Sequence, residues 1–87
     1  MMTPDHLIAV RSPFLATAVV QVTNIFPDTK LSQNRQVDFL FPDIPKVREV
    51  IGSFSDGTLS LPILVFTNIY RRVRGEMMNC MNHRGVR

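Results

Sequence analysis

The sequence predicts an α+β fold in which a small antiparallel β-hairpin or sheet packs against two C-terminal amphipathic helices. Val37, Phe39 and Phe41 alternate with Asp38 and Leu40, the period of a strand with one buried face. Apolar residues then recur at helical spacing after Asp43 and again after Ser60. The 87 residues, 45% apolar and 20% charged, are typical of one small globular domain, so a single domain over residues 1–87 is expected.

The beginning of the chain allows two alternatives. Residues 3–5 are typical of a helix start, with a hydroxyl cap, a proline and an acid in the first turn. An edge strand over residues 7–11 fits nearly as well. Ser12 and the proline after it can then begin another helical turn over residues 14–18, because serine caps helices and proline suits the first helical position.

Residues 19–26 are expected to form the first strand of the hairpin. Their β-branched content is high, and the even-numbered residues form the expected buried face. Residues 27–35 are expected to be a polar loop in which Leu31 is the only large apolar residue. Antiparallel pairing of residues 19–26 with residues 36–41 is the simplest topology for these strands.

The next segment predicts a helix from Asp43 to Phe54. Asp43 is the expected N-cap, Pro45 suits the first turn, and Gly57 can adopt the left-handed conformation that ends a helix.

The last helix is expected to begin near Ser60 or Leu61. Its apolar stripe consists of Phe66, Ile69, Tyr70, Val73 and Met77. The helical period is lost from Asn79, so residues 79–87 are expected to be a frayed basic tail. The expected core consists of Phe39, Phe41, Phe54 and Phe66.

The net charge of +3 is unevenly distributed. After residue 70 the balance is +4, whereas the first seventy residues have a balance of −1. A basic end of this kind can bind the phosphates of a nucleic acid. The candidate nucleic-acid-binding residues are Arg71, Arg72, Arg74, Arg84 and Arg87.

Three apolar residues are candidates for self-association. Leu40 faces away from the expected core, while Met78 and Met81 belong to a soft apolar cluster at the end of the last helix. A second copy of the chain, paired through a strand edge or through the last helix, would cover them. A homodimer and a protein partner are therefore expected.

Several residues also match a pattern of strand end, helix turn and basic helix. The matching positions are Thr3 and Asp5, Phe39-Leu40-Phe41, Asp43, Phe54-Ser55-Asp56-Gly57, Phe66 and the cluster from Arg71 to Arg74. In these positions the chain resembles a family of small bacterial proteins of uncharacterised function. The resemblance implies a hairpin followed by two helices, and it implies no catalytic residue because that family has no assigned activity.

The sequence offers little for catalysis or metal binding. No two carboxylates form a recognisable acid–base pair, and Cys80 has no evident partners for nucleophilic chemistry. Cys80 and His83 have a spacing that metals use, but two ligands cannot fill a zinc site. We therefore expect no enzyme, no cofactor and no metal.

Location and function are expected from the same features. A single cysteine favours the cytoplasm, and no apolar run is long enough to span a bilayer, so no membrane partner is expected. The sequence thus predicts a small non-catalytic binding or adaptor protein that self-associates. The alternative is a nucleic-acid-binding module that uses the basic C-terminal helix and tail.

Overall fold

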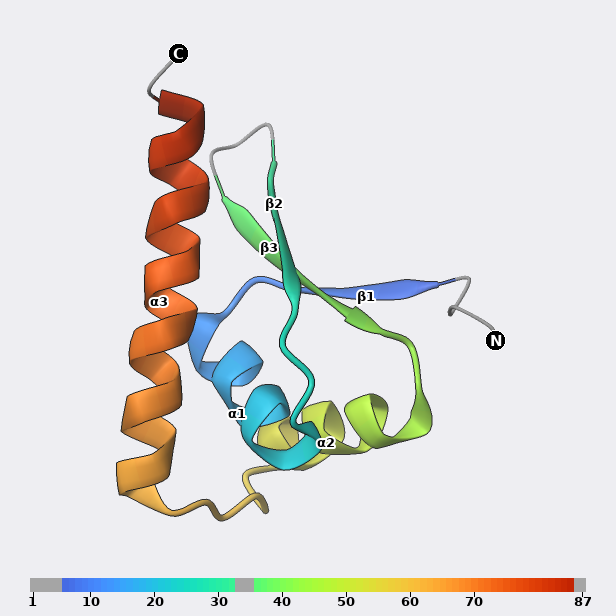
Figure 1. The fold of residues 1–87 in the computed structure, drawn as a ribbon. Coiled ribbons are helices and arrows are strands. Elements are labelled where there is room, and N and C mark those ends of the chain that lie inside the picture. The colour runs from blue at the N-terminus through green and yellow to red at the C-terminus, as the bar shows by residue number, and fades with distance from the viewer. Residues whose placement is uncertain (1–5, 33–35, 86–87) are drawn as a thin grey trace.

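The computed structural model describes residues 6–32 and 36–85, with the side chains up to Met81. The chain has an α+β fold, as predicted, with three helices and one antiparallel sheet (Figure 1). The elements in chain order are β1 (Leu7–Val10), α1 (Pro13–Thr23), β2 (Asp28–Leu31), β3 (Val37–Pro42), α2 (Pro45–Asp56) and α3 (Ile63–Gly85).

The sheet has the strand order β1-β3-β2, so β3 is the central strand. Phe39 pairs with Val10 of β1 on one side and with Thr29 of β2 on the other. Val37, Phe39 and Phe41 are buried, which confirms the predicted strand and its buried face. β1 agrees with the edge-strand alternative for residues 7–11, whereas residues 3–5 lie outside the described residues.

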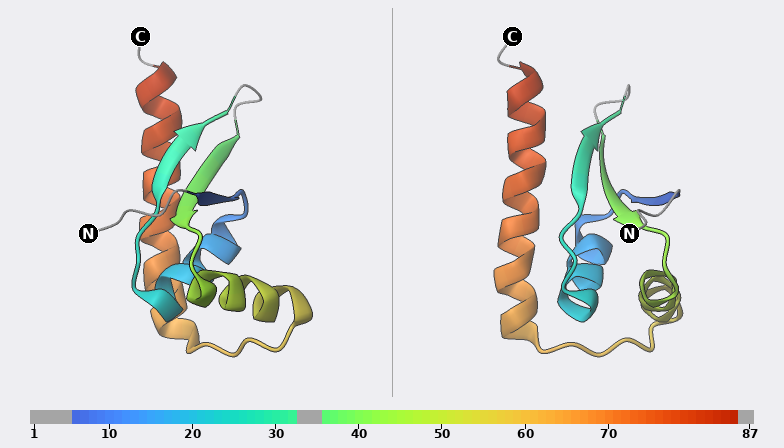
Figure 2. Two further views of the ribbon diagram at one scale, coloured as in Figure 1. Left: turned by 90° about the vertical axis from the view of Figure 1, so that its right-hand side faces the viewer. Right: turned by 45° about the vertical axis from the view of Figure 1, so that its right-hand side comes forward.

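The expected strand over residues 19–26 is wrong, because most of these residues belong to α1. The Oγ of Ser12 accepts a hydrogen bond from the Leu15 amide at 3.3 Å, and Asn24 ends the helix in the left-handed conformation with φ 61°. Ala16–Val20 are all buried, since α1 lies beneath the sheet between α2 and α3 (Figure 2). Five consecutive buried residues leave this part of the helix without a polar face, so its sequence lacks the helical period.

The expected loop over residues 27–35 is also wrong in part, because Asp28–Leu31 form strand β2. The strand was missed because it is only four residues long and its exposed positions carry Asp28 and Lys30. β2, and not residues 19–26, is the hairpin partner of β3. The hairpin closes with a hydrogen bond of 2.7 Å from the Ser32 amide to the Gln36 carbonyl.

Helix α2 begins later than predicted. Ile44 is its N-cap and makes no side-chain capping bond, so the assignment of Asp43 as the cap is wrong. The carboxylate of Asp43 instead accepts two hydrogen bonds from the guanidinium of Arg48, which lies in the first turn of α2. Gly57 has the predicted left-handed conformation, with φ 75°, and its amide bonds back to the last turn.

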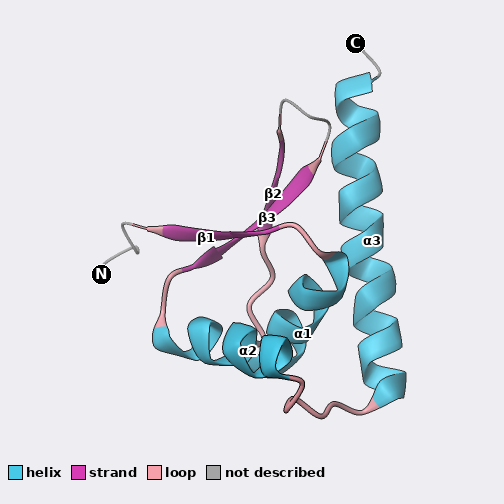
Figure 3. Cartoon of the chain, turned by 180° about the vertical axis from the view of Figure 1, so that it is seen from behind, coloured by secondary structure: helices cyan, strands magenta, loops and turns pink. Residues whose placement is uncertain are grey.

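Helix α3 begins at Ile63 and runs alongside the β2–β3 hairpin (Figure 3). The predicted stripe is confirmed: Val73 is fully buried, and Phe66, Ile69 and Met77 are partly buried against the core. Tyr70 is also partly buried, and its ring stacks on Phe14. The helix continues past Asn79 as far as Gly85.

The core differs from the expected set of four phenylalanines. Phe39 and Phe41 are fully buried, as predicted. Phe66 is only partly buried, and Phe54 is exposed at 37%, so its placement in the core is wrong. The valines and alanines of α1 occupy the centre instead, because α1 and not a strand lies behind β3.

Candidate interaction surfaces

One edge of the sheet is open. The carbonyl of His6 accepts a hydrogen bond from the Asp43 amide at 3.2 Å, so the backbone groups of His6 point toward β3. Successive residues of a strand direct these groups to opposite sides, and those of Leu7 and Ala9 therefore point away from β3. β1 is the last strand of the sheet on this side, and no strand within the described residues pairs with its free edge.

The sheet face opposite the helices is apolar next to this edge. Leu7 lies opposite Pro42, and Ala9 lies opposite Leu40, so these four side chains share one face. Leu7 is 56% exposed, and Leu40 is half-buried. We call Leu7, Ala9, Leu40 and Pro42 the open face. It ends at an ion pair of 3.2 Å between Arg11 and Asp38.

The other edge of the sheet is different. β2 carries the exposed charged side chains Asp28 and Lys30, and α3 packs against it. Charged side chains and a covering helix are two ways in which proteins protect a strand edge from pairing. The free edge of β1 is therefore the better edge for addition of another strand.

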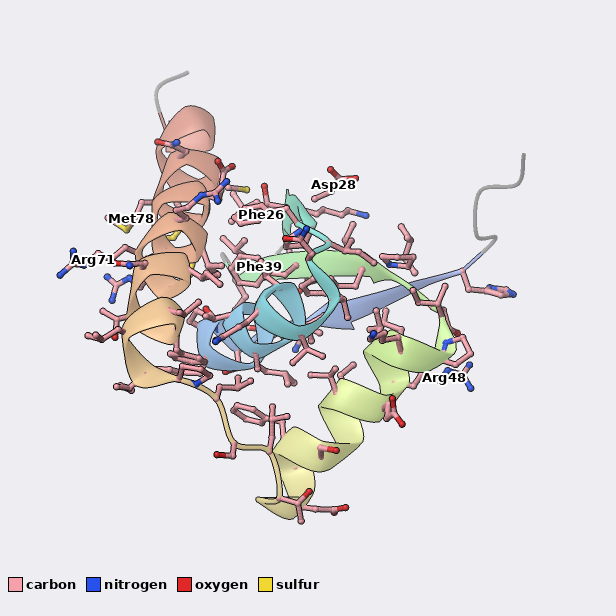
Figure 4. The ribbon with its side chains drawn as sticks, turned by 60° about the horizontal axis from the view of Figure 1, so that its bottom comes forward. Phe26, Asp28, Phe39, Arg48, Arg71 and Met78 are labelled. Carbon is pink, nitrogen blue, oxygen red and sulfur yellow. The ribbon has the colours of Figure 1, made fainter. Side chains whose placement is uncertain are left out.

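The three central arginines of α3 do not form one cluster. Arg71 is exposed and points away from the sheet, on the same side as Met78 (Figure 4). The guanidinium of Arg72 instead lies over the Phe26 ring, 4.7 Å from its centroid. That of Arg74 lies 6.0 Å from the centroid of Tyr70, whose ring stacks on Phe14. The side chains of Arg84 and Arg87 lie outside the described part of the chain.

The predicted self-association residues do not share one surface. Leu40 belongs to the open face of the sheet, whereas Met78 and Met81 are exposed on α3. The sheet face that carries Leu40 is opposite to the one that carries Phe39, and Phe39 is the residue directed toward the helices.

The sequence did not predict an apolar surface at the start of α3. Ile63 and Leu64 are 70% and 78% exposed, and Val65 is also exposed. Beside them is an open groove with a volume of about 260 Å³, lined by Phe54, Leu59, Leu61, Ile63 and Phe66. The signal available in the sequence was the absence of any charged residue between Asp56 and Arg71.

The clearest ionic interaction joins Asp43 and Arg48. The Nη2 of Arg48 donates to Oδ2 of Asp43 at 2.8 Å, and its Nε donates to the other carboxylate oxygen. The hydrogen bond from Arg48 holds the pKa of Asp43 below its usual value, and Asp43 raises the pKa of Arg48. Both side chains brace the turn between β3 and α2, and neither lines the groove beside α3.

Metal ligands do not gather at one place within the described part of the chain. Over residues 6–32 and 36–85, no three His, Cys, Asp or Glu side chains lie close enough to hold a metal ion. Cys80 is half-buried against the core, while the side chain of His83 lies outside the described residues. Within the same ranges, no helix combines the length and the apolar character that crossing a membrane requires.

Comparison with known proteins found no matching family model, no matching curated protein and no matching solved structure. The resemblance to small bacterial proteins of uncharacterised function therefore stays a prediction.

Proposed function

We propose that this chain is a non-catalytic binding protein that acts as a homodimer, in which two copies join through the free edges of their β1 strands. The observation that carries the proposal is the free edge itself, with the backbone groups of Leu7 and Ala9 directed away from β3. An unpaired apolar edge strand is a template for strand addition.

A second copy suits this edge because antiparallel pairing about a twofold axis is self-complementary. β1 has no charged residue and no proline between Leu7 and Val10. Pairing would extend the sheet across both copies and bring their two open faces side by side. Leu7, which is exposed in one copy, would then lie beside the β1 strand of the other copy and lose part of its contact with water.

Pairing through α3 has less support. Leu64, Arg71 and Met78 are spaced by seven residues, so they follow one side of the helix. An antiparallel pair of α3 helices that matched Leu64 with Met78 would place the two Arg71 side chains against each other. Like charges at the centre of an interface are unfavourable.

The nucleic-acid alternative also has less support, because Arg71 and Arg72 point in different directions and Arg72 packs over Phe26. A homodimer joined through β1 would leave both α3 helices and both grooves free. These free surfaces would be available to a protein partner, and the adaptor role is part of the proposal.

The test is to block the free edge without disturbing the fold. In Ala9→Pro, the ring removes an amide that points away from β3, which edge strands tolerate. The preceding residue Ile8 is already extended, as proline requires. Ala9→Val is the matched control, since it adds a similar volume and keeps the amide. Light scattering coupled to size-exclusion chromatography, run over a concentration series, would report the mass of each variant.

We expect the parent chain and Ala9→Val to form dimers and Ala9→Pro to be a monomer with the same circular dichroism spectrum. A parent chain that remains monomeric at the highest concentration reached would refute the proposal. A dimer that persists in a folded Ala9→Pro variant would refute the β1 interface.

A further inference from the structure

The side of α3 that faces away from the sheet has an unusual composition. We call this side the outward face, and it consists of Ile63, Leu64, Arg71, Arg74, Met78 and Met81, all of them exposed. Its ends are apolar and its middle is cationic. Met78 and Arg71 point away from the rest of the molecule together (Figure 4).

No acidic side chain interrupts this face. Glu76 is the only acidic residue of α3, and it lies about 140° around the helix from Arg71. The outward face therefore carries only positive charge, supplied by Arg71 and Arg74. A partner for the whole face must offer negative charge and an apolar phase together.

We infer that the outward face of α3 binds the surface of a lipid bilayer that contains anionic lipids. The helix, about 35 Å long at 23 residues, lies along the interface between headgroups and acyl chains. Ile63, Leu64, Met78 and Met81 enter the acyl boundary at the two ends of the helix. Arg71 and Arg74 meet the phosphates between them, and their long apolar stems suit this depth.

A nucleic acid fits the same face less well. It would satisfy the two arginines but would leave the four apolar side chains against a polar backbone or water. None of the six residues of the outward face is aromatic, so the face itself offers no ring for stacking on bases.

Surface binding of this kind differs from crossing a membrane. The expectation of no membrane partner depended on the length of apolar runs, and a helix that lies in the interface needs no such run. This inference is independent of the β1 interface, because β1 and α3 contribute different surfaces.

The experiment measures cosedimentation of the full chain with two kinds of vesicle. One is phosphatidylcholine alone, and the other contains equal amounts of phosphatidylcholine and phosphatidylglycerol. We expect binding to the anionic vesicles only, decreasing as salt is added. One basic side chain near an anionic surface contributes about fivefold to partitioning, so Arg71→Gln/Arg74→Gln should lower the partition coefficient roughly 30-fold.

Lys30→Gln/Lys46→Gln is the matched control. It removes the same two charges from exposed positions on β2 and α2, and it should keep most of the binding. Ile63→Ser/Leu64→Ser tests the apolar contribution, and it should also weaken binding to the anionic vesicles.

Three outcomes would overturn the inference. One is no binding to the anionic vesicles, and another is an equal loss in the arginine and lysine variants, which would indicate net charge alone. The third combines two results: Ile63→Ser/Leu64→Ser binds the vesicles as tightly as the parent chain does, and the parent chain binds a labelled DNA duplex more tightly than it binds either vesicle. That result would favour a nucleic acid as the partner.

Discussion

Replacement of Phe39 by alanine tests the central position of β3 in the core. The ring is fully buried between the sheet and the helices, and truncation of such a phenylalanine costs about 3–5 kcal/mol. A chain of 87 residues has a total stability of roughly 4–13 kcal/mol, so the variant should lose a large part of it. Phe39→Asp, which would bury a charge at the same place, should abolish cooperative unfolding.

The assay is equilibrium unfolding in urea, followed by circular dichroism. With a denaturant slope of about 1.5 kcal/mol per molar, the midpoint for Phe39→Ala should fall by roughly 2–3 M without a change in slope. Phe14→Ala is the control because it deletes the same atoms from a ring that is 52% exposed and stacks on Tyr70. Its midpoint should fall by less than about 1 M. Equal shifts in the two variants would refute the assignment of Phe39 to the core.

Three further predictions concern the turns and the ends of helices. Gly57→Ala should lower the free energy of unfolding in urea by about 1 kcal/mol, because an alanine there must adopt φ 75°. Gly52→Ala should raise it by about 0.5–1 kcal/mol, because Gly52 lies inside α2 with open space at its Cβ position. A change of the same sign in both variants would contradict this reasoning. Asp43→Asn should lower the melting temperature at neutral pH, because Arg48 lowers the pKa of Asp43 and stabilises the folded state above the usual carboxylate pKa. The difference in melting temperature should vanish as the pH falls through that lowered pKa, and a difference that persists in strong acid would exclude this cause. Ser12→Ala should lower the free energy of unfolding in urea by about 1 kcal/mol, because the N-cap of α1 is lost. Ser12→Asn, whose side chain can still cap the helix, should keep most of the parent's stability, and a loss as large as that of Ser12→Ala would exclude the cap as the cause.

The sequence predicts well those elements that have one buried face and one solvent-exposed face. Buried and partly buried residues alternate along β3 because one side of the strand packs on the helices. The apolar stripe of α3 can be recognised in the sequence because the rest of that helix is exposed to solvent. α1 is buried on all sides over residues 16–20, so its valines and threonines resemble a strand when only the sequence is considered. Thr17 and Thr23 satisfy their hydroxyls within that helix, through bonds of 2.6 Å to the carbonyls of Pro13 and Val19.

The candidate surfaces were predicted less completely than the fold. The sequence indicates which residues are apolar or charged, but a strand edge is open or closed only once the order of the strands is known. The order β1-β3-β2 exposes β1 and places β2 beside α3. Helix geometry alone predicts that consecutive residues such as Arg71 and Arg72 point in different directions. The contact of Arg72 with the Phe26 ring could not be predicted in this way, because Phe26 belongs to a segment far away in the sequence.

The strand order also has a consequence for the order of folding. β1 and β2 do not pair with each other, and each requires β3, which follows both of them in the chain. While the chain emerges from the ribosome, the first two strands therefore have no partner, and α1 between them lacks the cover of both α2 and α3. The sheet can close only after residue 42 has been synthesised, so the first half of the chain spends its earliest moments with its most apolar helix uncovered.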